Sequence, residues 1–394
     1  MKLINRTSYM DTLTSLIGVP DIKVITGIRR SGKSKLLEAL RDYVEANLSN
    51  SNVIHINYNL DEFENLLEYH ALLAYVKEHR VSGKQNFLLI DEVQMCDGFE
   101  RAINSLHASE QYDIFITGLL SSDLSTLFTG RTFEIEVFPF SFEEYRLYGD
   151  EGEVDRDFDE YARTGGMSGS YPYPLQEQRY QYLSNVFKTL IVRDIVQRHN
   201  VRNESALLRI ADYMMDNVSN ITSARNITDI LNADGLKITN KTVGTYMGYL
   251  CDAFAFYKVR RYDIHGKKYL KSGEKYYLAD HAFKYALLGT RDMDWGRVYE
   301  NMVAIELLRR GYEVYVGVLY KKEIDFVAIK RSEKLYIQVS DDISSDKTFE
   351  REISPLLSIG DAYPKMILAR THHEATDRNG VQIVDLARWL CDEA

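Results

Sequence analysis

The stretch from Val24 to Ser34 constrains the fold more than any other part of this 394-residue chain. Its sequence, VITGIRRSGKS, contains the pattern G-x-x-x-x-G-K-S, which is typical of a loop that binds phosphate groups. Apolar residues at 22–25 predict a buried strand before the loop, and leucines at 36, 37 and 40 predict a helix behind it. This order of strand, loop and helix favours an α/β fold.

The residue types in this loop suit the binding of a nucleotide. Gly27 and Gly32 let the backbone turn its N–H groups toward a phosphate, and the helix N-terminus adds a partial positive charge. Lys33 can reach the β- and γ-phosphates, while the hydroxyl of Ser34 can coordinate Mg²⁺. We therefore predict ATP and Mg²⁺ as cofactors, with nucleotide contacts from Gly27, Arg30, Ser31, Gly32, Lys33, Ser34 and Lys35.

A second motif lies at residues 87–92, where an apolar run ends in two carboxylates, Asp91 and Glu92. This pattern is typical of a buried parallel strand whose C-terminal end faces the ligand. Asp91 is then expected to hold the Mg²⁺, and Glu92 to orient and polarise the attacking water. The alternative is a core strand that ends in two solvated acids.

Composition limits the classes of partner and compartment. The net charge of −10 argues against a surface that is basic throughout, so any nucleic-acid contact has to be a local patch. Cys96, Cys251 and Cys391 are far apart, which favours a reducing cytoplasm and gives no zinc or disulfide framework. No apolar run approaches the roughly 18 residues of a membrane span. We expect a soluble cytoplasmic protein with no membrane contact.

The pattern along residues 22–147 alternates between strands and helices, which predicts a parallel sheet covered by helices. Further strands are expected at 53–57, 114–117 and 133–137, and helices at 66–78 and 99–107. Ser141 and Glu144 form a capping-box pattern that opens another helix. The acidic stretch at 149–159 predicts either an exposed linker or the solvated face of a helix, and a long helix is expected at 177–197.

Residues 206–280 change to helices followed by a hairpin, the order of a winged helix. Within it, residues 237–275 carry nine lysines and arginines against three acids, which is the expected footprint of contact with a phosphate backbone. The alternatives are a solvated hairpin or a wing that docks protein. The candidate DNA contacts are Lys258, Arg260, Lys267, Lys268 and Lys271.

Residues 295–394 follow the order of a restriction-endonuclease-like core, with a helix and then strands at 313–318, 325–329 and 335–339. Such a core binds Mg²⁺ through acids and uses a lysine to assist the attack of water. Here Glu300 and Asp325 supply acids, but Gln338 stands in place of a second sheet acid and Ser340 in place of the lysine. We expect a nuclease-like fold without nuclease activity.

Taken together, these motifs resemble a widespread prokaryotic family of AAA-type ATP-binding proteins whose C-terminal half is a domain of unknown function. The motifs that carry the resemblance are residues 26–34, 89–94, 129–131, 139–145, 165–167, 193–195, 296–301 and 322–326. The resemblance implies an AAA+ core, a winged helix and a PD-(D/E)XK nuclease-like terminal fold. The domains expected are 1–148 for the ATPase core, 149–204 for a helical lid or linker, 205–292 for the winged helix and 293–394 for the nuclease-like part.

The resemblance also implies roles for single residues. Arg131 sits where such ATPases place an arginine finger, with a surface arginine as the alternative, Thr117 lies near the sensor position, and Arg193 is a candidate second sensor. Two departures from the family pattern stand out: about four residues of the sensor loop are missing after Gly118, and Ser168 replaces the usual proline.

The function that these features favour is an ATPase that couples ATP binding or hydrolysis to rearrangement of a DNA-contacting C-terminal half. A homo-oligomer is one expected assembly of this ATPase. A signalling-type ATP switch whose winged helix binds protein is the first alternative. An ATP-regulated nuclease is the second.

Overall fold

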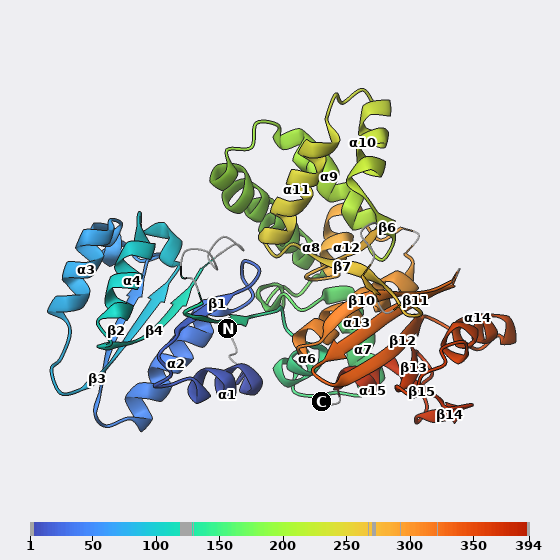
Figure 1. Cartoon of the computed structure of the whole chain (residues 1–394), viewed down its shortest axis with the longest axis horizontal. Helices are drawn as coiled ribbons and strands as arrows, with labels where there is room; N and C mark the ends of the chain where they lie inside the picture. Colours follow the sequence, from blue (N-terminus) through green and yellow to red (C-terminus); the bar gives the residue numbers. More distant parts are fainter. Residues whose placement is uncertain are drawn as a thin grey trace. The chain divides into compact units, whose positions relative to one another are not determined.

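The fold was analysed in a computed structural model that describes residues 4–118, 128, 130–266, 268–269, 273–291, 293–320 and 322–391 (Figure 1). Chain contacts divide the molecule between Pro139 and Phe140 into two compact units. Among the helices of the described residues, none combines the length and apolar character needed to cross a membrane.

The first unit contains a five-stranded sheet in which all neighbouring strands are parallel. The strand order is β2-β3-β4-β1-β5, so β4 lies between the strand that precedes the glycine-rich loop and the strand that ends in Asp91. The strands are β1 (Ile22–Thr26), β2 (Ser51–Asn57), β3 (Gln85–Asp91), β4 (Tyr112–Thr117) and β5 (Thr132–Glu136). The predicted α/β core with a parallel sheet is confirmed.

Helices cover both faces of this sheet because successive side chains of a strand point to opposite sides. On β3, Leu88 and Ile90 pack under α3 and α4, whereas Phe87 and Leu89 pack under α1 and α2. Figure 1 shows the two helical layers in blue and cyan. The helices are α1 (Thr7–Ser15), α2 (Lys33–Asn47), α3 (Tyr69–Glu78) and α4 (Phe99–Ala108).

One helix of this unit begins later than the sequence predicts. Residues Asp61–Leu66 form a 3₁₀ turn, and α3 starts only at Tyr69. The side chain of Glu68 accepts a hydrogen bond from the backbone N–H of His70, which caps the helix at that point.

The second unit begins with helices. The capping box of Ser141 and Glu144 opens α6 (Phe142–Gly149), as predicted. The acidic stretch continues as α7 (Val154–Thr164), whose residues Phe158 and Tyr161 are buried, so the exposed-linker alternative is wrong for most of that stretch. α8 (Gln176–Thr189) continues into a π-helix (Leu190–Gln197), and α9 (Glu204–Asp216) follows.

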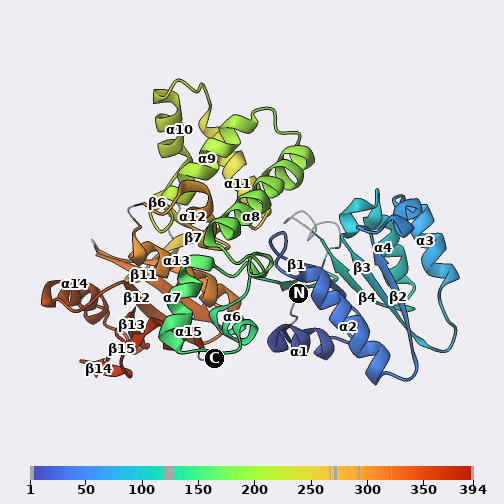
Figure 2. The same cartoon turned by 180° about the vertical axis from the view of Figure 1, so that it is seen from behind.

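The next segment contains two helices and a hairpin, in the predicted order. α10 (Ala224–Ala233) and α11 (Asn240–Asp252) precede β7 (Phe256–Asp263) and β9 (Glu274–Leu278), which pair in antiparallel fashion. Two short strands, β6 (Ile221–Thr222) and β8 (Lys268–Tyr269), pair with β9 and β7 respectively. Figure 2 shows α9, α10 and α11 grouped together.

The terminal segment extends the same sheet, because β10 pairs in parallel with β7. A meander of β10, β11 and β12 is antiparallel, and β12, β13 and β15 are then parallel. The sequence predicts most of these strands but does not predict α14. The elements are α12 (Ala282–Leu288), α13 (Trp295–Arg309), β10 (Glu313–Leu319), β11 (Lys322–Lys330), β12 (Glu333–Ser340), α14 (Asp346–Leu357), β13 (Lys365–Ala369), β14 (Thr376–Arg378), β15 (Val381–Asp385) and α15 (Leu386–Cys391).

Candidate functional site

The glycine-rich loop joins β1 to α2 and has the backbone that its sequence requires. Gly27, Arg30 and Gly32 all have positive φ values, of 127°, 66° and 102°. A Cβ atom at Gly27 would also overlap the carbonyl oxygen of Val137, so this position needs glycine for space as well as conformation. The loop leads directly into the N-terminus of α2, where free backbone N–H groups favour an anion.

Lys33 is the first residue of α2, and its side chain folds back over the loop. Its ammonium Nζ donates to the carbonyl oxygens of Gly27 at 2.9 Å and Ile28 at 3.0 Å, and the residue is only 4% exposed. Both of these acceptors are neutral carbonyls, and a phosphate is a stronger acceptor for an ammonium group.

Asp91 and Glu92 lie at the carboxyl end of β3, and both form a hydrogen bond with the hydroxyl of Thr117. Thr117, at the end of the neighbouring β4, donates its Oγ1 hydroxyl to Asp91 Oδ1 and accepts the backbone N–H of Glu92 at 3.0 Å. Glu92 has a left-handed backbone with φ 57°, and its carboxylate accepts from the amide of Gln94. The residue that the sequence places near a sensor position therefore touches both acids.

The residues present fit a nucleotide with a divalent cation. Among the described residues, Asp91 Oδ2 and Ser31 Oγ are buried polar atoms without a hydrogen-bond partner. A buried carboxylate oxygen is costly to leave unpaired, and it is the kind of oxygen that Mg²⁺ prefers. Ser34 lies half-buried in the first turn of α2, whereas Arg30 and Lys35 are exposed.

Arg131 lies at the opposite edge of the sheet from this loop. Its carbonyl accepts the N–H of Ile22 at the start of β1, so roughly 16 Å of strand separates it from the loop at the other end. Its exposed side chain lines a cavity of about 870 Å³ together with Arg80 and Lys84. At this distance Arg131 does not reach the nucleotide loop of its own chain, and both the arginine finger and the surface arginine stay predictions.

Two further predictions about the sensors are not tested by the structure. The short loop after Gly118 falls outside the residues that the structure describes. Arg193 is an exposed residue of the π-helix in the second unit. Its role as a second sensor stays a prediction.

The hairpin offers less exposed and unpaired positive charge than its sequence predicts. Lys258 and Arg260 are exposed on β7, although Lys258 forms an ion pair with Glu274 at 3.4 Å. Lys275 is one of the nine basic residues of the predicted footprint but is only 3% exposed, so its place in that footprint is wrong. Lys267 and Lys271 lie outside the described residues, and for Lys268 the structure gives only the backbone pairing with Asp263.

Lys275 lies among three carboxylates of the terminal segment. Its Nζ is 2.9 Å from Glu300 Oε1, 2.9 Å from Glu323 Oε1 and 3.8 Å from Asp325 Oδ1. The hydroxyl of Tyr277 donates to the same oxygen of Glu300 at 2.7 Å. The lysine that lies beside Glu300 and Asp325 therefore comes from β9, and not from the position of Ser340 on β12.

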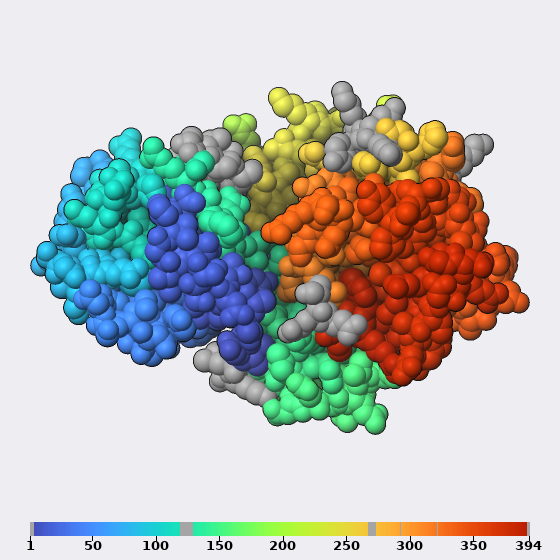
Figure 3. Space-filling view, turned by 60° about the horizontal axis from the view of Figure 1, so that its bottom comes forward, coloured from blue at the N-terminus to red at the C-terminus, as the bar shows by residue number. Residues whose placement is uncertain are grey.

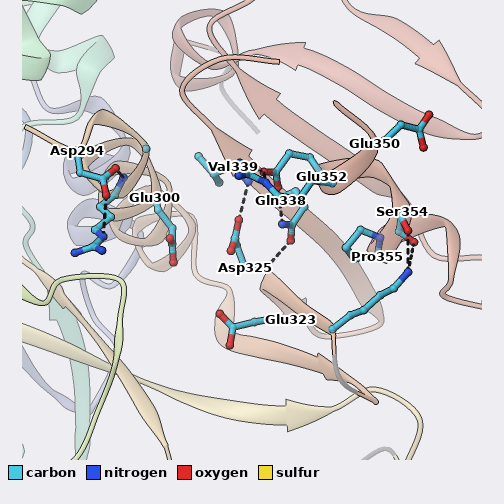
Figure 4. A pocket seen from close by; sticks show the side chains of 14 residues that line it. Asp294, Glu300, Glu323, Asp325, Gln338, Val339, Glu350, Glu352, Ser354 and Pro355 are labelled. Atoms are coloured by element: carbon cyan, nitrogen blue, oxygen red, sulfur yellow. Dashed lines mark hydrogen bonds and ion pairs between the residues drawn. The ribbon is translucent and has the colours of Figure 1, made fainter. Parts of the chain in front are cut away.

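The acids around Lys275 open onto a cavity of about 560 Å³ (Figure 4). In it, Gln338 accepts the backbone N–H of Asp325 at 2.8 Å and donates its amide to Glu352 at 2.9 Å. The hydroxyl of Ser340 instead donates to the carbonyl of Asp342. Within the described parts of the chain, no group of three or more histidines, cysteines or acids is arranged to hold a metal ion.

Burial changes the protonation of this cluster. Desolvation, with the nearby charge of Glu300, raises the pKa of Asp325 to about 8, and burial also raises the pKa of Glu300. For Lys275, burial lowers the pKa, but the carboxylates of Glu300, Asp325 and Glu323 outweigh it and raise the pKa overall. The lysine therefore stays charged while the acids compete for protons.

Comparison with known proteins identifies two segments. Residues 19–146 match the model of an AAA domain, and residues 155–294 match a domain of unknown function, DUF8612. An uncharacterized protein of Haemophilus influenzae is 34% identical over 400 residues, covering 98% of each chain. An uncharacterized protein of Methanocaldococcus jannaschii is 26% identical over 357 residues, covering 84% of this chain and 77% of the relative.

Solved structures with some likeness to the chain include AMPPCP-bound DnaA from Aquifex aeolicus, at 16% identity and a TM-score of 0.31, covering 62% of this chain and 86% of that one. PCH-2 of C. elegans is 22% identical with a TM-score of 0.27, covering 40% and 45%. At these TM-scores the likeness says nothing further about this chain.

Proposed function

The chain belongs to the family of AAA-domain proteins that includes the Haemophilus influenzae relative, and from this premise we propose that it is an Mg²⁺-dependent ATPase. The observation that carries the proposal is the glycine-rich loop with Lys33 folded back over it, together with the unpartnered oxygen Oδ2 of Asp91 at the end of β3. The first suits the β- and γ-phosphates of ATP, and the second suits Mg²⁺. Ser34 is the proposed second protein ligand of the metal.

Glu92 is the proposed catalytic carboxylate. Its backbone N–H donates to the hydroxyl of Thr117, and its carboxylate accepts a hydrogen bond from the neutral amide of Gln94. A carboxylate held this way can orient and polarise a water molecule for attack on the γ-phosphate. The Mg²⁺, when bound, would neutralise charge on the phosphates.

Substitution of Glu92 by Gln tests this role. The amide keeps the shape but cannot polarise water as a carboxylate does, so turnover should fall at least about a hundredfold while ATP binding is kept. Steady-state phosphate release and calorimetry on the same preparation measure both. Equal turnover in Glu92→Gln and wild type would remove Glu92 from the mechanism.

Arg131 is the proposed arginine finger of a homo-oligomer. Its position at the far edge of the sheet supports action on a neighbouring copy, because it is too far from its own loop. An Arg131→Ala protein should bind ATP without hydrolysing it. Mixing it with a Lys33→Ala protein should restore part of the activity through complementary interfaces.

We further propose that the second unit contains a winged helix, α10 to β9, followed by a PD-(D/E)XK-like terminal part. Support comes from the element order helix, turn, helix and hairpin, and from a helix followed by an antiparallel meander and a parallel strand. The proposed boundaries are 149–204, 205–292 and 293–394. Cys96, Cys251 and Cys391 form no disulfide in the described part of the chain, which supports the proposed cytoplasmic location.

We propose DNA as the partner of the winged helix, with Lys258 and Arg260 exposed on β7 as the contacts on described residues. Lys267, Lys268 and Lys271 complete the proposed set. The ion pair of Lys258 with Glu274 and the burial of Lys275 reduce the charge available, and they favour the alternative in which this surface binds protein. ATPase rates with and without duplex DNA separate the two. Stimulation that weakens with salt supports DNA, and an unchanged rate supports a protein partner.

Nuclease activity is not expected of the terminal part. Gln338 contributes no charge, and the amine of Lys275 is engaged by three carboxylates that a metal would need. Incubation of the protein with supercoiled DNA in Mg²⁺ and Mn²⁺ should leave the DNA intact. Nicking that disappears in Asp325→Ala would contradict this.

A further inference from the structure

The residue that joins the glycine-rich loop to the end of the first unit is Arg6, which lies just before α1. It is only 5% exposed. Its Nη1 donates to the carbonyl oxygen of Ser31 in the loop at 2.9 Å, and its Nη2 donates to the carbonyl oxygen of Phe138 at 3.0 Å. One planar guanidinium therefore bridges two segments that are more than a hundred residues apart in the sequence.

The second of these segments is the exit from the unit. Phe138 follows β5 and is one residue before Pro139, the last residue of the first compact unit. Its N–H donates to the hydroxyl of Tyr9 at 3.1 Å, and the guanidinium of Arg6 lies 4.4 Å from the centre of the Tyr9 ring. Residues before and within α1 thus hold both backbone polar groups of Phe138. Figure 3 shows this N-terminal segment in dark blue against the rest of its unit.

The other end of the loop rests on the same exit segment. The N–H of Val137 donates to the carbonyl of Thr26 at 2.9 Å, and the Val137 carbonyl fills the space where a Cβ of Gly27 would lie. The loop therefore contacts residue 137 at its beginning and is bridged to residue 138 through Arg6 at its end. A shift of the loop backbone has to be accommodated there.

Nucleotide binding would change the hydrogen bonds of the loop itself. The ammonium of Lys33 now lies on the carbonyls of Gly27 and Ile28, and a bound phosphate would compete for it. The backbone N–H groups of the loop would also turn to the phosphate. Ser31, which accepts the hydrogen bond from Arg6, belongs to this loop. A movement of the loop therefore either shifts the Ser31 carbonyl together with Arg6 or is resisted by Arg6.

We propose that Arg6 is a positioning residue that transmits occupancy of the nucleotide loop to the exit segment 137–139. The bridge between Ser31 and Phe138 makes the two segments move as one, so the chain that leaves the unit reports whether the loop is filled. This inference rests on the proposed function, since it requires a nucleotide in the loop.

Hydrogen exchange of the Phe138 amide, with and without saturating AMPPNP and Mg²⁺, tests the proposal. In the wild type, nucleotide should slow this exchange at least about tenfold, because the filled loop stabilises the exit segment against local opening. In Arg6→Met at saturating nucleotide, the same comparison should show less than about a twofold change. Arg101→Met is the matched control, because Arg101 also lies over a tyrosine ring, Tyr69 at 5.6 Å, but does not touch the loop.

Each outcome decides the matter. Absence of AMPPNP binding to the wild type would overturn the proposed function and this inference with it. Binding with a tenfold protection that persists in Arg6→Met would overturn the inference alone. If Arg6→Met does not fold, Arg6→Lys replaces it, because a single ammonium keeps the charge but not the two-pronged bridge. Protection in Arg6→Lys should then fall below about threefold, and full protection would overturn the proposal.

Discussion

Lys33 of the first unit and Lys275 of the second are both buried, and the surroundings of these two lysines differ in charge. Lys33 in the first unit donates to two neutral carbonyls, and the nearby Asp91 keeps one oxygen without a partner. Lys275 in the second unit lies among Glu300, Glu323 and Asp325. The first site keeps an unpartnered carboxylate oxygen, whereas the acids of the second site share a cation within the protein.

This difference is the one expected between a site that binds a ligand and a cluster that stabilises the packing of the protein. Unsatisfied buried polar atoms destabilise a fold, so they persist where a ligand completes them. A buried ion-pair cluster whose members satisfy one another can instead fix how β9 packs against α13 and β11. In line with the proposed function, we expect ligand chemistry at the first site and a structural role for Lys275 at the second.

Removing the second lysine should have the largest effect on stability. Lys275→Met leaves Glu300, Glu323 and Asp325 without their shared cation and should lower the free energy of unfolding by about 3–5 kcal/mol at neutral pH. Chemical denaturation followed by circular dichroism measures it. Lys322→Met is the control, since Lys322 is exposed and bonds only to Ser354 and Ser358 among the contacts described, and it should change stability by less than about 0.5 kcal/mol. Equal effects of the two variants would erase the contrast between the units.

The effect of Lys275→Met should also depend on pH. The pKa of Asp325 is raised to about 8 in the folded protein, above its unfolded value, so the folded state holds that proton and loses relative stability as pH rises from about 4 to about 8. Without the cation, the pKa values of Glu300 and Asp325 rise further, because Lys275 lowers both. Lys275→Met should therefore be less destabilising at pH 5 than at pH 8, as measured by denaturation at both values. A difference that is independent of pH would contradict the proposed cluster.

Neutralising Asp91 in the first site should change the free energy of unfolding by less than Lys275→Met does, and in the opposite direction. Asp91→Asn keeps an oxygen for the Thr117 hydroxyl but removes a buried charge with an unpartnered atom, so the nucleotide-free protein should be unchanged or up to about 1 kcal/mol more stable. Thermal unfolding without nucleotide or Mg²⁺ measures this. A loss of several kcal/mol would mean that Asp91, like Lys275, has a structural role.

The site around Lys33 could be predicted from the sequence to a much greater extent than the site around Lys275. The loop with Lys33 and the strand ending at Asp91 are local patterns, and their strand, loop and helix order follows from short-range periodicity. Thr117 came only from the family resemblance, because its contact with Asp91 depends on the strand order. The acid stretch at α7 was ambiguous because charge alone does not show which face Phe158 buries.

The second site could not be predicted, for a physical reason. The acids Glu300 and Asp325 are visible in the sequence, but their cation comes from β9, which reaches them through pairing among distant strands. A count of basic residues over 237–275 therefore placed Lys275 on a surface that it does not reach. Arg6 was missed for the same reason, because nothing near it in the sequence indicates contact with Ser31 and Phe138.

The central claim, that the loop with Lys33 binds ATP, is tested most directly by calorimetric titration of wild-type and Lys33→Ala protein with ATP and Mg²⁺. We predict binding of one ATP per wild-type chain and affinity at least about a hundredfold weaker in Lys33→Ala, because the variant loses charge-assisted hydrogen bonds to the phosphates. The same two proteins should unfold at similar denaturant concentrations without nucleotide. Equal ATP affinity in the two proteins would contradict the assignment of this loop as the nucleotide site.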